Sequence, residues 1–198
     1  IRNQVERLGE LVKNLLTLSR LDEMQERLQT ADFSCSETVK ECVDAFAPMA
    51  QAKGLQMQKQ IPQGLYMNGC ESNIRQFVTI LMDNAVKYAP DGGCIRITLE
   101  KKERTLELSV YNDCEEIPDG DLNRLFDRFY RADSSRSRKT GGYGIGLSVA
   151  HAIVKARRGK ITARAKDSGY LLHGKASIEI DGCFKADSRK KLLSVFLS

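Results

Sequence analysis

Residues 141–156 read GGYGIGLSVAHAIVKA, a run of glycines that leads directly into apolar residues at helical spacing. Glycines at 142, 144 and 146 allow backbone amides to approach an anion closely, and the amino end of the following helix adds partial positive charge. The pattern therefore predicts a phosphate cradle, with a plain flexible loop as the alternative. It is not a P-loop, because no Gly-Lys-Ser or Gly-Lys-Thr occurs, and it lacks the preceding strand and wider spacing of the dinucleotide fingerprint.

Cations precede the glycines, within reach of a phosphate held there. They belong to residues 112–144, which show no sustained period, and a loop of about 30 residues inside a compact domain is usually functional. The alternative interpretation is a solvated run of charges on a mobile loop. The cations are Arg131, Arg136, Arg138 and Lys139.

A polar cluster interrupts the otherwise apolar helix predicted over residues 72–88. Asn84, Lys87 and Tyr88 share one face of this helix at the spacing i, i+3, i+4. An amide oxygen suits Mg²⁺, an ammonium suits phosphate, and an aromatic ring can stack on a base. Taken alone, the cluster is also typical of a helix end that turns to solvent.

The remaining periodicity predicts the elements around this helix. We expect an amphipathic helix over residues 1–28, one continuous helix from Ser34 or Ser36 to Lys53, and a helix over 145–156. Strands are predicted over 29–33, 55–61, 95–99, 106–110, 160–166 and 175–180, and 95–110 forms a hairpin. Together, these helices and strands indicate an α+β fold, a two-layer sandwich of a mixed sheet with helices on one face.

Composition places the 198 residues among soluble globular chains, with 41% apolar and 29% charged side chains. No apolar run in the sequence approaches the roughly 20 residues that cross a bilayer. The second half is basic: residues 1–99 carry 11 basic and 12 acidic side chains, and residues 100–198 carry 20 and 14. No nucleic-acid partner is expected, because no aromatic residues are interleaved with these cations.

The six cysteines are scattered without a CxxC pair, and the two histidines are His151 and His173. This spacing does not favour a zinc site. Isolated cysteines are typical of a reducing compartment, so we expect a cytoplasmic location.

Four motifs occur in an order that resembles the catalytic domain of sensor histidine kinases, in the GHKL ATPase superfamily. They look like the family's N box, first glycine box, F box and second glycine box, and lie at 83–88 (DNAVKY), 117–118 (IP), 125–133 (LFDRFYRAD) and 142–147 (GYGIGL). The resemblance implies a Bergerat-type ATP-binding catalytic domain over residues 29–184. Residues 1–28 resemble the end of the dimerisation and histidine-phosphotransfer hairpin, and 185–198 form a basic C-terminal tail.

Residue by residue, the resemblance implies a site for ATP and Mg²⁺. Asn84 would ligate Mg²⁺, Lys87 would reach a phosphate, and Tyr88 would pack near the adenine. Residues 131–141 would form a mobile lid, with Phe126 and Phe129 anchoring it in the core. The other nucleotide-binding residues implied are Asn112, Ile117, Arg131, Lys139, Gly142, Tyr143, Gly144, Gly146 and Leu147.

Two departures from the family pattern bear on nucleotide affinity. The first glycine box normally begins with an Asp that accepts a hydrogen bond from the adenine amino group, whereas residues 112–116 read NDCEE. Alternation along the strand places Asn112, and not Asp113, at the Asp position. An amide accepts without the charge of a carboxylate, so we expect affinity to fall by about 1 kcal/mol. Ile80 also stands where the family commonly has an Asn one turn before the metal ligand.

The resemblance implies an ATP-dependent protein-histidine kinase of a two-component system. The phosphoacceptor histidine is expected to precede Ile1, because neither His151 nor His173 has the right context, and self-phosphorylation is therefore not expected. A response regulator receiver domain and, through the N-terminal hairpin, a second copy are the implied partners of a membrane-bound bacterial sensor. The alternative is a degenerate, non-catalytic module for nucleotide sensing or docking, which would not require Mg²⁺-dependent ATP binding.

Overall fold

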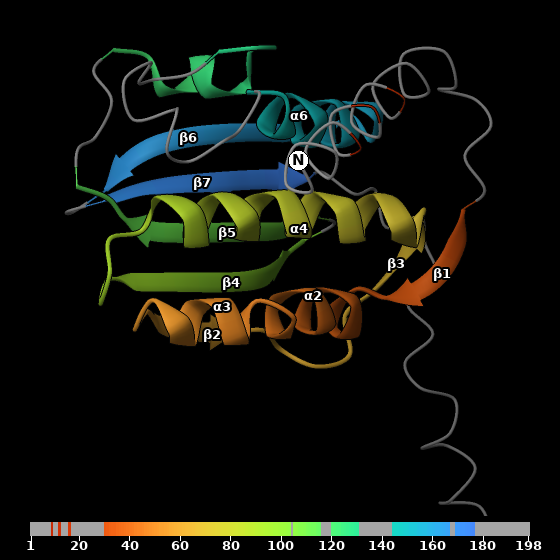
Figure 1. The fold of residues 1–198 in the computed structure, drawn as a ribbon. Coiled ribbons are helices and arrows are strands. Elements are labelled where there is room, and N and C mark those ends of the chain that lie inside the picture. The colour runs from red at the N-terminus through yellow and green to blue at the C-terminus, as the bar shows by residue number, and fades with distance from the viewer. Residues whose placement is uncertain are drawn as a thin grey trace, which may run out of the picture.

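The computed structural model of the chain is a two-layer sandwich in which helices cover one face of a five-stranded sheet (Figure 1). It describes residues 9, 12, 16, 30–103, 105–115, 120–130, 144–166 and 169–176. The predicted α+β fold is confirmed. In chain order the elements are β1 (Ala31–Ser34), α2 (Cys35–Asp44), α3 (Ala47–Ala52), β2 (Gln56–Gln60), β3 (Tyr66–Gly69), α4 (Glu71–Tyr88), β4 (Cys94–Lys102), β5 (Thr105–Asp113), η1 (Leu122–Phe126), α6 (Gly146–Ala156), β6 (Lys160–Lys166) and β7 (Gly169–Ala176).

The sheet is mixed, with the strand order β2-β4-β5-β7-β6. β2 pairs in parallel with β4, because β3 and α4 lie between them in the chain and return it to the same end of the sheet. The other pairs are antiparallel. The predicted hairpin is present as β4 and β5, and β1 pairs with β3 in a separate two-stranded sheet.

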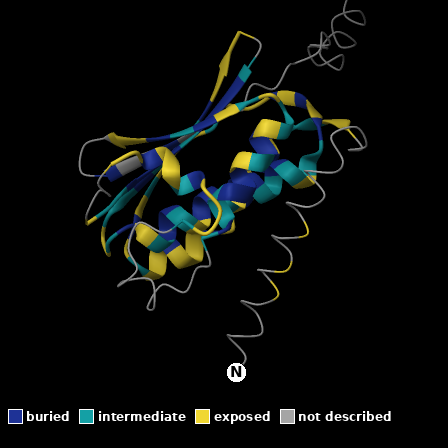
Figure 2. Ribbon diagram, turned by 90° about the horizontal axis from the view of Figure 1, so that it is seen from above, coloured by how far each residue is buried: buried dark blue, intermediate teal, exposed yellow. Residues whose placement is uncertain are grey.

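The core lies between the sheet and the helices, where Figure 2 shows the buried residues concentrated. Ile95 and Ile97 of β4 and Val110 of β5 are completely buried on the inner face. Burial of each such side chain contributes about 1.5–3 kcal/mol. α4 supplies the opposite wall along most of its length, with Ile74, Phe77, Val78, Leu81, Met82, Ala85 and Val86.

The single helix predicted between residues 34 and 53 is wrong, because the structure has two helices there. α2 ends at Asp44 and α3 begins at Ala47. Pro48, in the first turn of α3, has no N–H to donate to the carbonyl of Asp44, so a continuous helix would lose a hydrogen bond and meet the proline ring. The predicted ends are confirmed: the Ser34 side chain caps α2, and Gly54, with φ +65°, follows α3.

Three further elements differ from the sequence prediction. β3 and η1 were not predicted, because four or five residues are too few to show a period. β7 begins at Gly169, before the strand predicted at 175–180, because it pairs with both β5 and β6 along its length. Residues 177–180 of that strand, and the tail at 185–198, lie outside the described residues.

Three residues of the N-terminal segment are described, and all three are helical: Gly9, Val12 and Leu16. Val12 is 48% exposed and Leu16 is 53% exposed. Their spacing puts them on one side of a helix. The rest of the amphipathic helix predicted over residues 1–28 lies outside the described residues. Among the described helices, none combines the length and the apolar content that a bilayer span requires.

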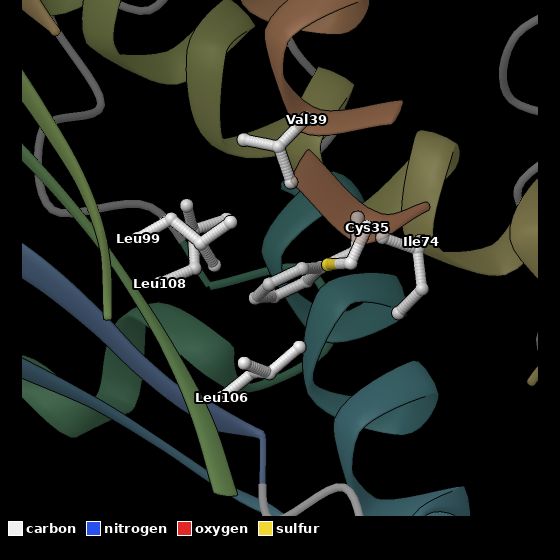
Figure 3. Close-up of a pocket in the computed structure, with 7 residues that line it drawn as sticks. Cys35, Val39, Ile74, Leu99, Leu106 and Leu108 are labelled. Atoms are coloured by element: carbon white, nitrogen blue, oxygen red, sulfur yellow. The ribbon is translucent and has the colours of Figure 1, made fainter. Parts of the chain in front are cut away.

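A small apolar pocket lies where α4 begins (Figure 3). Side chains from α2, α4 and the sheet converge on it. None of the lining side chains could bind a phosphate or the polar edge of a base. The pocket is therefore a packing feature of the core, at the end of α4 opposite to the polar cluster. Its lining is Cys35, Val39, Ile74, Phe77, Leu99, Leu106 and Leu108.

Four of the six native thiols are expected to react in two classes. Burial raises the pKa of Cys35 to about 12, and burial also raises the pKa of Cys42. Because the thiolate is the nucleophile, both groups stay protonated and inert at pH 8. We expect a disulfide reagent at this pH to label the partly exposed Cys70 and Cys94, and to reach Cys35 and Cys42 only after unfolding. Mass spectrometry of labelled peptides checks this, and rapid native labelling of Cys35 would contradict it.

Candidate functional site

The polar cluster on α4 begins with Asn84, whose side chain is half-buried. Its Nδ2 donates to the carbonyl oxygen of Ile80, 2.8 Å away and one turn earlier in the helix. The nitrogen and oxygen of an amide lie on opposite sides of Cγ, so this bond directs Oδ1 away from the helix backbone. An amide oxygen held in this way is a ligand that suits Mg²⁺.

Lys87 and Tyr88 form the last turn of α4. The Lys87 Nζ lies 5.2 Å from the centroid of the Tyr88 ring, a cation–π contact, and Tyr88 is 42% exposed. Desolvation raises the pKa of the Asp83 carboxyl above its ordinary value, and Lys87, one turn later, lowers it. The turn presents an ammonium and an aromatic ring next to the Asn84 amide.

Asn112 is completely buried near the end of β5. Its Nδ2 donates to the main-chain oxygen of Asp113 at 2.8 Å. Its Oδ1 is also buried, and it has no hydrogen-bond partner in the described part of the chain. A buried acceptor left unpaired costs about 1–3 kcal/mol. The amino group of an adenine is a donor that fits this oxygen.

The neighbouring carboxylate of Asp113 is used elsewhere. Its Oδ2 accepts from the main-chain N–H of Cys94, and its Oδ1 accepts from the hydroxyl of Tyr111, both at 2.7 Å. Tyr111 lies two residues before Asp113 in β5 and therefore on the same face of the sheet. The alternation predicted for this strand is confirmed, with Asn112 facing the helices and Asp113 facing away.

The last glycine of the run, Gly146, meets α4 one turn before Asn84. Gly144 has φ +71°, a left-handed conformation that favours glycine, and α6 begins at Gly146. A Cβ at Gly146 would stand 3.6 Å from Cγ2 of Ile80, so the first turn of α6 lies directly against α4. Ile80, the apolar departure from the family pattern, fills this contact. The positive end of α6, followed by the half-buried Leu147, thus lies beside the candidate metal ligand.

The expectation that two phenylalanines anchor the lid in the core is wrong for one of them. Phe126 is 6% exposed, and its ring centroid lies 6.0 Å from that of His151. Phe129 is 65% exposed. Its φ is +64°, and its N–H donates to the carbonyl of Gly144 at 3.0 Å. This bond ties together the described residues on either side of 131–143.

α4 packs against both α6 and β5, so the elements that carry the described candidate residues are neighbours in the fold. The structure places Asn84, Lys87 and Tyr88 on α4, Gly146 and Leu147 on α6, and Asn112 on β5. Five other predicted site residues lie outside the described residues: Ile117, Arg131, Lys139, Gly142 and Tyr143.

Two residues that support these elements were not predicted from the sequence. A Cβ at Gly169 would lie 2.9 Å from the main-chain carbon of Asn112 and from Cα of Asp113, so β7 approaches β5 closely there. Lys53 donates to main-chain carbonyls at the end of α4. A glycine at a strand start and a lysine before a glycine are both common, so neither pattern singles out a functional position.

Residues 69–181 match the family of histidine kinase-, DNA gyrase B-, and HSP90-like ATPases. The matched segment contains α4, β5 and α6, the three elements that carry the described candidate residues.

Two bacterial signalling proteins illustrate the relationship. The chain is 33% identical over 168 residues to sensor protein SphS of Synechococcus elongatus, covering 81% of this chain and 41% of SphS. It is 30% identical over 163 residues to the signal transduction histidine-protein kinase BaeS of Escherichia coli, covering 82% of this chain and 35% of BaeS. The chain thus spans less than half the length of these relatives.

Solved structures of histidine kinases share the fold. The kinase AdeS of Acinetobacter baumannii superposes with a TM-score of 0.73 at 26% identity, covering 91% of this chain and 82% of that chain. Full-length ShkA in complex with AMPPNP gives 0.74 at 21% identity, covering 92% and 38%. ThkA in complex with the response regulator TrrA gives 0.69 at 22% identity, covering 88% and 48%. Because the family match extends over more than half of its residues, the chain belongs to the histidine kinase-, DNA gyrase B-, and HSP90-like ATPases, and it contains the ATP-binding domain of a sensor histidine kinase.

Proposed function

We propose that this chain binds ATP with Mg²⁺ and positions the γ-phosphate for transfer to a histidine outside these 198 residues. The observation that carries the proposal is the buried Oδ1 of Asn112, an unpartnered acceptor within the described part of the chain. A site that keeps such an acceptor dry favours a ligand that donates a hydrogen bond to it, because binding then recovers the desolvation cost.

The residues have separate roles in this proposal. Asn84 holds Mg²⁺ through Oδ1, because its Nδ2 is already bonded to Ile80. Lys87 supplies a cation for a phosphate, and the amino end of α6 contributes backbone N–H groups and partial positive charge. ATP supplies the transferable phosphoryl group when bound. Phosphoryl transfer then depends on positioning and charge neutralisation.

The remaining predicted residues complete the site in the same proposal. Tyr88 and Leu147 pack near the adenine, and Gly144 and Gly146 allow the backbone to approach the phosphates. Ile117, Arg131, Lys139, Gly142 and Tyr143 are assigned to the nucleotide by their motif positions.

Neither histidine of the chain suits the role of phosphoacceptor. His151 lies on α6, where its ring is close to that of Phe126, and desolvation lowers its pKa. His173 lies within β7, paired with Ser109 of β5 and Thr162 of β6. We therefore assign the phosphoacceptor to a segment outside this sequence.

The proposal extends to partners and location. A response regulator receiver domain is the expected recipient of the phosphoryl group, supported by the ThkA–TrrA complex of the same fold. A second copy is the expected partner of the N-terminal helix, because Val12 and Leu16 are exposed on one side of it. The relatives are bacterial sensor proteins, so we place this chain in the cytosolic part of such a sensor.

Isothermal titration of the chain with ATP, with and without Mg²⁺, tests the proposal. We expect Mg²⁺ to strengthen binding, and we expect Asn84→Ala to weaken Mg²⁺-dependent binding about tenfold, because it removes one metal ligand. Asn73→Ala, at the opposite end of the same helix, is the matched control and should bind as the unmodified chain does. Absence of heat and of thermal protection at saturating ATP would refute the proposal in favour of a docking module.

A further inference from the structure

Lys53 makes an unusual set of contacts at the end of α4. It follows α3, and its Nζ donates to the main-chain carbonyls of Val86 and Ala89, each at 2.8 Å, and of Lys87 at 3.5 Å. Its own carbonyl accepts from the N–H of Gly92, 2.9 Å away. Figure 1 shows α3 and the end of α4 at the same edge of the molecule. The side chain and the backbone of this one lysine thus hold the turn that ends α4.

The sequence of α4 explains why an outside donor is needed there. The last four carbonyls of a helix lack intrahelical donors. The N–H of residue 90 would extend the pattern by pairing with Val86, but residue 90 is proline and has no N–H. The Lys53 ammonium takes this place, and its charge complements the negative end of the helix dipole. Lys59, by contrast, pairs with the Asp44 carboxylate.

We propose that Lys53 is a positioning residue for nucleotide binding, which rests on the proposed ATP site. Its two nearest acceptors, the carbonyls of Val86 and Ala89, bracket Lys87 and Tyr88 in the chain. Lys53 therefore fixes the backbone from which the phosphate and adenine ligands project. Asn84 is held independently, by its own bond to Ile80.

This independence separates the proposal from a purely structural role. Lys53→Met removes the ammonium while keeping a long side chain, and we expect it to weaken ATP binding about fivefold. The ratio of affinities with and without Mg²⁺ should stay unchanged, because the Asn84 turn is not affected. Asn84→Ala should instead reduce that ratio. Lys53→Arg, which retains charge and donors, should stay within about twofold of the unmodified chain.

Two controls complete the titrations. Lys59→Met makes the same substitution at a lysine whose partner is the Asp44 carboxylate, and it should leave ATP affinity unchanged. Val43 lies on α2 and is fully buried, so Val43→Ala leaves a cavity in the core. This variant should lower the unfolding temperature without changing ATP affinity. Hydrogen exchange at Ala89, whose N–H bonds to Ala85, should accelerate in Lys53→Met with or without ATP.

The outcomes are distinct. Faster exchange at Ala89 with unchanged ATP affinity would overturn the proposal and leave Lys53 as a helix cap only. The proposal would also be overturned if Lys53→Met, at the same loss of stability, lost no more ATP affinity than Val43→Ala. If Lys53→Met does not fold, Lys53→Gln, with two donors and no charge, should weaken ATP binding by less than about fivefold relative to the unmodified chain. Unchanged affinity in Lys53→Gln would overturn the proposal. Failure of the unmodified chain to bind ATP would refute the proposed function itself.

Discussion

Replacing Asn112 with leucine is expected to weaken ATP binding about 100-fold, or roughly 2.7 kcal/mol, because the adenine amino group would lose its buried acceptor. The same change should leave the unfolding temperature of the free chain nearly unchanged, because removing the unpartnered Oδ1 offsets the loss of the hydrogen bond from Nδ2 to the Asp113 carbonyl. Leucine branches at Cγ as asparagine does, and it removes an acceptor that is buried without a described partner. Calorimetric titration and thermal unfolding of the same samples measure both effects.

The companion variant Asn112→Asp should bind ATP more tightly and lower the stability of the free chain. A carboxylate strengthens the hydrogen bond to a donor, so ATP should bind more tightly by about 1 kcal/mol. In the free chain this charge would be buried at a fully enclosed position next to the Asp113 carbonyl, which now accepts from Asn112, so stability should fall. Unchanged ATP affinity in Asn112→Leu would remove the main support for the proposed site.

Replacing Gly169 with alanine is expected to lower the free energy of unfolding by about 3 kcal/mol, because the new Cβ meets the backbone of the adjacent strand. That Cβ would lie 2.9 Å from the main-chain carbon of Asn112 and from Cα of Asp113. Backbone in the middle of a sheet cannot move aside as a flexible side chain can. The unfolding temperature should fall by roughly 6–12 °C, and ATP affinity should fall as well, since the strain falls on Asn112.

Gly69→Ala is the graded control for this prediction. A Cβ there would lie 2.7 Å from Nη2 of Arg157 and 2.9 Å from Cε of Met67, which are the ends of flexible side chains. We expect a smaller loss of stability than in Gly169→Ala, and no change in ATP affinity. Equal losses in both variants would show that β7 can shift away from β5.

Several elements could be predicted because their information is local. The α4 pattern extends over five turns, and the β4–β5 hairpin alternates cleanly, so residue order alone sets which side chains are buried. The same alternation put Asn112 on the inner face, and the structure confirms this placement. The Ser34 cap and the Gly54 stop are similarly encoded within a few residues.

Other features depend on partners distant in sequence. β7 pairs with β5 from Gly169 onward, and the N–H of the exposed Phe129 bonds to the carbonyl of Gly144, 15 residues later in the chain. A periodic pattern does not record such pairings, because each residue's own propensity is compatible with more than one environment.

The amino-acid sequence by itself was enough to predict the fold class, because helical and strand periodicity are local, and its four motifs carried the resemblance to the family that assigns Asn84, Lys87 and Asn112 to the nucleotide site. Only the tertiary structure decided which atoms are already used. It pairs Nδ2 of Asn84 with Ile80, leaves Oδ1 of Asn112 buried without a described partner, and brings Lys53 to the end of α4. The physical reason is that hydrogen-bond satisfaction depends on which chain segments meet, and a side chain's spacing along the sequence does not specify its neighbours in space.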